Sequence, residues 1–240
     1  MAEELGKIEK PEAKSFKGTR KMYVVPLLFA GADAPPEFVE KIERYWLQVG
    51  ENILSQESRV GKVNRIYHEA VSFGGQEGLQ VLQNWNAGSY AIVKQKMDDG
   101  AILEATDLAS LADECMDWER CMLMGFYSQK VMETVTANYR EASQKRYKYI
   151  SGIIAESLAA GEIGLLFMRE GQPVQFPEDT DVFTVAPPVL DEIRRWLRER
   201  QQQHHHDENC GCDEGDDYDC GEEEGCDCGC EDNRDSDASK

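Results

Sequence analysis

The chain has little that would place it in a membrane or direct it to export. No apolar run approaches the roughly 18–20 residues that cross a bilayer. Residues 1–21 are charged throughout and contain no hydrophobic segment of the kind found in signal peptides. We therefore expect a cytoplasmic protein with no membrane partner. In that reducing setting the eight cysteines are expected to be thiols or metal ligands rather than disulfides.

The sequence also lacks the usual signatures of catalysis and nucleotide binding. It contains no Walker motif, no dinucleotide-binding glycine fingerprint and no internal repeat. Its closely spaced cysteines are not separated by two residues, as they are in zinc fingers. Because these motifs are absent from the sequence, no reaction can be assigned from them. The function is therefore predicted from composition and from a few local patterns.

Negative charge is concentrated at one end of the chain. Residues 201–240 hold 15 acidic and 2 basic residues, whereas the preceding 200 residues hold 31 acidic and 24 basic ones. The body is therefore a mildly acidic domain, which argues against a broad electrostatic surface for nucleic acid. We expect a mobile leader over residues 1–21 and a disordered, acidic, Cys/His-rich tail over residues 201–240.

Strands and helices are expected to alternate between residues 22 and 200. The apolar patterns predict strands over residues 22–29, 63–73, 101–105, 163–168 and 181–185, separated by helical segments. This alternation predicts a layered α/β domain with a mostly parallel sheet flanked by helices. Residues 163–168 are apolar apart from one glycine, which is typical of a strand covered on both faces.

Several features of individual elements follow from the same patterns. Pro26 predicts an edge position or a bulge in the first strand. Pro35-Pro36 and Pro187-Pro188 each fit the start of a helix. Two apolar faces at helical spacing are expected to face the core. They consist of Phe38, Ile42, Trp46, Val49 and Ile53 in the first helix, and of Val189, Ile193, Trp196 and Leu197 in the last.

A helix, a glycine and a buried strand follow one another at Leu158-Ala159-Ala160-Gly161-Glu162-Ile163-Gly164-Leu165-Leu166-Phe167. This pattern, within residues 150–200, resembles the L7Ae-like last domain of eukaryotic-type peptide release factors and their bacterial relatives. The resemblance implies an α/β fold and a ribosome or RNA partner. The chain spells Gly74-Gly75-Gln76, but its surroundings do not resemble the catalytic loop of that family. The resemblance therefore does not imply that this chain hydrolyses peptidyl-tRNA.

The tail holds the strongest chemical pattern. Six thiols and three imidazoles lie within 27 residues that contain almost no apolar side chains. Soft thiolates and imidazoles suit zinc, copper(I) or nickel, and a bound metal would supply folding free energy that this segment lacks. Redox-sensing disulfides and an acidic extension without a dedicated role are the alternatives. The candidate ligands are Cys210, Cys212, Cys220, Cys226, Cys228, Cys230, His204, His205 and His206.

Two patterns in the body offer further candidates. His68, the only histidine of the body, is followed by Glu69, and this pair could support acid–base chemistry or could be a satisfied structural pair. A helical run around residues 140–149 interleaves basic residues with tyrosines, and it could bind RNA or be a solvated helix face. Its basic residues are Arg140, Lys145, Arg146 and Lys148. Cys115 and Cys121 are expected to be buried small apolar residues.

The sequence thus leaves three functional interpretations open. The first is an α/β binding or accessory protein whose tail coordinates a soft metal, or passes it to a metalloprotein partner. The second is a ribosome- or RNA-associated module, and the third is an enzyme with its site near His68 and Glu69.

Overall fold

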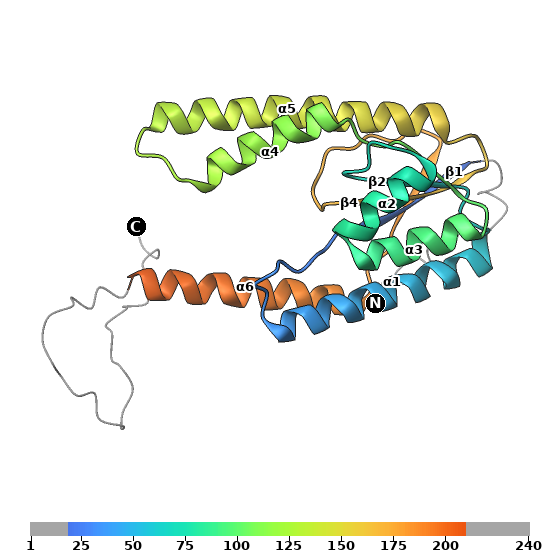
Figure 1. Cartoon of the computed structure of the whole chain (residues 1–240), viewed down its shortest axis with the longest axis horizontal. Helices are drawn as coiled ribbons and strands as arrows, with labels where there is room; N and C mark the ends of the chain where they lie inside the picture. Colours follow the sequence, from blue (N-terminus) through green and yellow to red (C-terminus); the bar gives the residue numbers. More distant parts are fainter. Residues whose placement is uncertain (1–18, 210–240) are drawn as a thin grey trace, which may run out of the picture. The chain divides into compact units, whose positions relative to one another are not determined.

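The computed structural model describes residues 19–209, and within its last helix it describes no side chains at residues 201 and 203–209. The chain divides into two compact units, Met1–Glu199 and Arg200–Lys240. The first unit contains a five-stranded sheet with helices on both faces, which confirms the layered α/β class (Figure 1). None of the helices in the described part of the chain is long and apolar enough to cross a membrane.

The strands and helices alternate along the chain as the sequence pattern predicts. The strands are β1 (Arg20–Pro26), β2 (Arg65–His68), β3 (Ile102–Leu103), β4 (Ile163–Met168) and β5 (Thr180–Thr184). The helices are α1 (Pro36–Val60), α2 (Gly75–Trp85), α3 (Ala87–Asp98), α4 (Ala109–Leu123), α5 (Gln129–Ser157) and α6 (Pro188–Asn209).

The sheet is parallel throughout, with the strand order β3-β2-β4-β1-β5. β4 lies between β1 and β2, pairing Ile163 with Lys21 and Gly164 with Arg65. All six of its residues are buried, as expected for a central parallel strand. Residues 150–200 therefore do not build a separate domain, because their main strand is the centre of the sheet that residues 20–26 and 65–68 complete.

Helices cover both faces of the sheet (Figure 1), and each face has its own apolar core. On one face α1, α2, α3 and the start of α6 pack on the strands, and the first-helix stripe predicted from the sequence lies in that core, with Ile42, Trp46, Val49 and Ile53 buried. On the other face the C-terminal half of α5 packs through Tyr147, Ile150 and Ile154, and Leu158, directly after the helix, joins them. Both faces are covered, which is what a parallel sheet needs.

Some expected boundaries and faces differ from the structure. The strands expected over 63–73 and 101–105 are shorter in the structure, at Arg65–His68 and Ile102–Leu103. After each strand the backbone bends into a turn with buried polar groups. Pro26 marks neither an edge nor a bulge: β1 lies between β4 and β5, and the proline, which has no N–H to donate, is simply its last residue. The expected disorder from residue 201 is replaced by helix as far as Asn209.

The core face of α6 also differs from the prediction. Val189 and Ile193 are buried as expected, but Leu190 takes the third place and Leu197 is exposed. Trp196 is only partly buried. Its ring stacks on Phe38 with centroids 4.6 Å apart, and its indole N–H donates to the Glu37 carboxylate at 2.6 Å. Trp196 thus joins α6 to α1 at the edge of the core instead of filling the core.

Candidate functional site

Charged side chains are buried where β2 and β3 end. Glu69 follows β2 and Asp107 follows β3, and both are almost inaccessible, with exposed fractions of 3% and 2%. The carboxyl ends of parallel strands meet at one edge of a sheet, which is where α/β proteins usually place their sites. Ala70, between these strand ends, has the left-handed φ of 75°, and its N–H donates to Asp107 at 3.0 Å.

Arg146 of α5 binds both of these carboxylates. Its Nε donates to Asp107 Oδ2 at 3.0 Å, and its Nη1 lies 3.3 Å from Glu69 Oε1. The guanidinium is itself buried, with the residue 3% exposed. The hydroxyl of Tyr147, the next residue, donates to Glu69 at 2.9 Å. Two strand ends and the long helix are therefore joined through one buried arginine.

Arg169, directly after β4, extends the same network to α4. Its backbone N–H donates to Glu69 Oε2 at 2.8 Å and its Nε donates to Glu69 Oε1 at 2.9 Å. Its Nη1 reaches Glu119 of α4 at 3.1 Å. Burial alone would lower the pKa of the Arg169 guanidinium, but its interactions with Glu69, Tyr147 and Glu119 together outweigh burial, and the pKa is raised. We call Glu69, Asp107, Glu119, Arg146 and Arg169 the ionic cluster.

The ionic cluster is arranged for rigidity. Its two arginines face three carboxylates, and the acceptor oxygens of Glu69 are occupied by donors from two different elements. Buried charges are tolerated when they are paired and hydrogen-bonded to this extent. The cluster therefore fixes where α4 and α5 leave the sheet.

His68 is held in the core beside this cluster. Its side chain is fully buried, between the rings of Trp85 and Phe167. Nδ1 donates to the Glu69 carbonyl, which leaves Nε2 to accept from the Ser89 hydroxyl at 3.2 Å. Burial lowers the pKa of His68 to about 4, so the imidazole is neutral at pH 7. This arrangement is the satisfied structural pair that the sequence left as an alternative to catalysis.

The neutral state of His68 predicts a pH-dependent stability. The unfolded imidazole has a pKa near 6.5, so between pH 6.5 and 4 the unfolded chain binds more protons than the folded one. The free energy of unfolding therefore keeps its full value above pH 6.5 and decreases as the pH falls towards 4, by up to about 3 kcal/mol. We expect denaturant unfolding to show that the native protein loses more of its free energy of unfolding between pH 7 and pH 4.5 than the His68→Gln variant does. Parallel losses in the two proteins would contradict the buried neutral imidazole.

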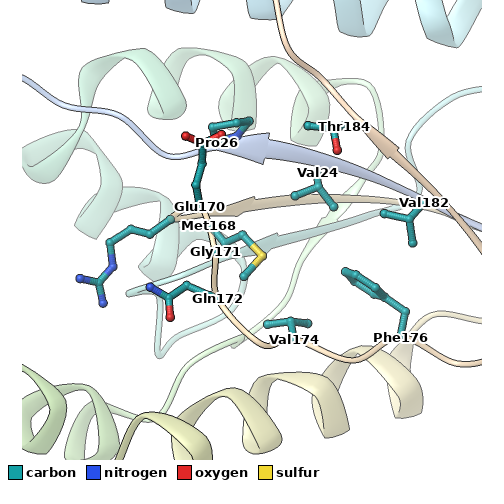
Figure 2. Close-up of a pocket in the computed structure, with 11 residues that line it drawn as sticks. Val24, Pro26, Met168, Glu170, Gly171, Gln172, Val174, Phe176, Val182 and Thr184 are labelled. Atoms are coloured by element: carbon teal, nitrogen blue, oxygen red, sulfur yellow. The ribbon is translucent and has the colours of Figure 1, made fainter. Parts of the chain in front are cut away.

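A pocket opens at the same sheet edge, on the α5 face (Figure 2). It has a volume of about 250 Å³, and Figure 2 shows Val24, Met168, Val174, Phe176 and Val182 around it. Two of its charged lining residues are already bonded elsewhere: Glu170 pairs with Arg194, and Arg169 belongs to the ionic cluster. The pocket thus has an apolar wall, but its lining brings no acid–base pair or nucleophile together.

The basic run of α5 is divided between the core and the surface. Arg140, Lys145 and Lys148 are exposed, and Lys145 pairs with Glu141 at 2.8 Å. Arg146 is not on that surface, because its guanidinium is the centre of the ionic cluster. It is therefore a structural residue here, and the expected four-residue RNA surface is reduced to three cations beside acidic neighbours.

The helices α4 and α5 form a hairpin whose tip is apolar and exposed. The two helices pack against each other, and the end of the hairpin where α4 turns into α5 extends beyond the strands in Figure 1. Cys115, Val135 and Ala142 are buried along it, which confirms Cys115 as a small core residue; Cys121 is only partly buried. At the turn Leu123 and Met124 are 83% and 85% exposed, and Tyr127 is fully exposed at 112%. Val131 and Met132, in the first turn of α5, are also exposed.

The predicted metal ligands of the tail fall outside what the structure shows. The six cysteines lie beyond the described residues, and the side chains of His204, His205 and His206 are not described. Among the side chains that the structure describes, no group of three or more His, Cys, Asp or Glu is placed to hold a metal ion. The tail site therefore stays a prediction.

Comparison of the chain with protein-family models, with curated proteins and with solved structures gave no significant match.

Sequence reasoning missed both the ionic cluster and the hairpin tip. Arg146 lies four residues before Ile150 and four after Ala142, on the buried face of α5, and that spacing was the available signal. The tip lies at the end of a stretch, Trp118–Phe126, whose apolar residues fit no single period. Its exposure follows from how far α4 and α5 run beyond the sheet, which no local pattern encodes.

Proposed function

We propose that this protein is a binding or accessory protein whose α4–α5 hairpin docks a protein partner through its apolar tip. The observation that carries the proposal is the exposure of Leu123, Met124 and Tyr127 together at one turn. Large apolar side chains gathered on a monomer surface mark interaction sites more often than chance. Methionine and tyrosine are also among the side chains that protein interfaces favour.

The charges around the tip support a protein partner over nucleic acid. Arg120 pairs with Asp117 on α4, and on α5 exposed Lys130 is followed by exposed Glu133. The rim is thus balanced in sign, whereas a nucleic-acid surface needs a clear excess of positive charge. An apolar centre with a mixed polar rim is the usual arrangement of protein–protein contacts. We infer a partner that offers an apolar groove with a polar margin.

The ionic cluster supports the same function from the other end of the hairpin. It binds α5 through Arg146 and α4 through Glu119 to the ends of three neighbouring strands. A rigidly held hairpin loses less conformational freedom on binding than a flexible one, so more of the contact energy remains as affinity. The sheet acts as the support, and the tip acts as the contact surface.

The test is site-specific photo-crosslinking in cells that naturally make the protein. A photoreactive phenylalanine analogue at position 127 should crosslink to a protein, whereas the same analogue at exposed Leu47 of α1 should not. The identified partner, once purified, should bind the native protein about tenfold or more tightly than a tip variant with Leu123→Ser, Met124→Ser and Tyr127→Ser. A control with Leu47→Ser, Leu54→Ser and Val60→Ser, all exposed on α1, should bind like the native protein.

Other crosslinked products at position 127 would overturn the proposal. Crosslinking to RNA would favour the ribosome- or RNA-associated interpretation, and crosslinking between two copies of the chain would indicate self-association. Equal affinity of the tip variant and the α1 control would show that the tip is not the contact surface.

A further inference from the structure

A second pocket lies on the opposite face of the sheet from the one in Figure 2, beyond the end of β1. It has a volume of about 390 Å³ and is lined by Phe29 and Ala30 after β1, Ile42, Glu43 and Trp46 of α1, and Trp85 to Gly88 at the α2–α3 junction. A volume of this size suits a small ligand. It shares no lining residue with the pocket of Figure 2 or with the α4–α5 hairpin.

Three aromatic rings give this pocket its character. Phe29 and Trp85 are 56% and 46% exposed, and their ring centroids are 5.8 Å apart at an interplanar angle of 45°. Trp46 is largely buried and contributes from α1. Large aromatic side chains are costly to leave in water, yet these two rings lie open around a hollow. Their π faces are electron-rich and attract cations.

The rings are held in place by the surrounding structure. The ring of Trp85 packs edge-on against buried His68 at 5.7 Å between centroids. A Cβ at Gly88 would lie 2.1 Å from the Trp46 ring, so the glycine is what allows the indole to approach α3. Asn86 donates to the Leu28 carbonyl at 3.0 Å and accepts from the Ser89 N–H at 3.0 Å, which joins the α2–α3 junction to the segment bearing Phe29. The pocket is therefore already formed without a ligand.

Glu43 supplies a charge among these rings. It is exposed on α1, one helical turn before Trp46, and lines the pocket. The C-terminus of α2 and the N-terminus of α3 meet at Asn86, so their opposite helix-end charges offset each other there. The carboxylate of Glu43 is the only formal charge among the residues that line the pocket. A cation is thus the complementary ligand.

We propose that this pocket binds a quaternary ammonium group, with Trp85, Phe29 and Trp46 contacting its methyl groups and Glu43 balancing its charge. Such a group is both cationic and apolar at its surface, so it matches aromatic faces better than a strongly hydrated primary ammonium. The group can belong to a free small molecule, such as choline, or to a trimethylated lysine side chain of a protein. The proposal is independent of the hairpin tip.

The experiment is a titration of the full chain, followed by tryptophan fluorescence and calorimetry, with choline and with 3,3-dimethyl-1-butanol, its neutral isostere. Choline should bind at millimolar concentration or below, and the isostere about tenfold more weakly. Trp85→Ala should lower choline affinity about tenfold, and Glu43→Gln about threefold. Glu51→Gln, on an exposed position of the same helix, should leave the affinity unchanged. Thermal melts of each variant would show that it is folded.

A third arm uses the amide of N-acetyl-trimethyllysine to identify the source of the group. Tighter binding of choline would assign the pocket to a free small molecule, and tighter binding of the amide would assign it to a modified protein. Either result supports an ammonium site. Equal binding of choline and the isostere, or no binding of any of the three compounds, would overturn it.

Discussion

Arg146→Ala is expected to destabilise the protein by about 3–5 kcal/mol, because it removes the only buried cation that contacts both Glu69 and Asp107 within the described residues. The two carboxylates would stay buried without their shared partner, and an unpaired buried charge is far more costly than a lost surface bond. The measurement is denaturant unfolding at pH 7. Arg140→Ala, at an exposed position six residues earlier on the same helix, is the matched control. It should change the free energy of unfolding by no more than about 0.5 kcal/mol.

A second substitution separates lost pairing from lost packing. Asp107→Asn removes one of the two carboxylates, so in the Arg146→Ala background it should cost less than it does alone. This non-additivity is expected because both changes act on one ionic cluster. If Arg146→Ala alone unfolds close to the native midpoint, or if the two effects simply add, the cluster does not hold the strand ends to α5.

Phe167→Ala is expected to cost about 3–5 kcal/mol, for a different physical reason. Phe167 is fully buried in the central strand β4, and its ring contacts those of Trp46 and His68, with centroids 6.2 Å and 5.4 Å apart. The truncation leaves a cavity between α1 and the sheet that neighbouring rings cannot fill without leaving their own partners. Denaturant midpoints measure the effect.

Phe73→Ala is the control for that truncation. Phe73 lies in the loop before α2 and is half exposed, so the same loss of a ring should cost less than about 1 kcal/mol. A similar cost at both positions would show that the aromatic packing around β4 contributes little to stability.

The predictions for individual elements succeeded where burial follows directly from local spacing. Ile163 to Met168 is a short apolar run between flanking glycines, which favoured a covered strand over a buried helical turn, and it forms the strand β4. The α1 stripe repeats over several turns, and a helix with one apolar side has only one way to bury it. The predictions failed for the α6 face, where Leu197 is exposed, because the second half of that stripe extends past the edge of the core.

What the sequence by itself determined about this protein is its class: a parallel α/β domain whose strands and helices follow from hydrophobic periodicity and proline positions. The ionic cluster and the two surfaces proposed for binding were decided by tertiary structure alone. Glu69 and Arg169 meet from positions 100 residues apart, and Arg146 lies in a run of charges that looks like solvated helix until α5 packs on the sheet. Trp46 and Trp85 line one pocket only because α1 and the α2–α3 junction pack on the same face of the sheet. The physical reason is that periodicity records which side of an element is buried, whereas a site needs particular side chains from different elements to meet, and only the packing of the whole chain brings them together.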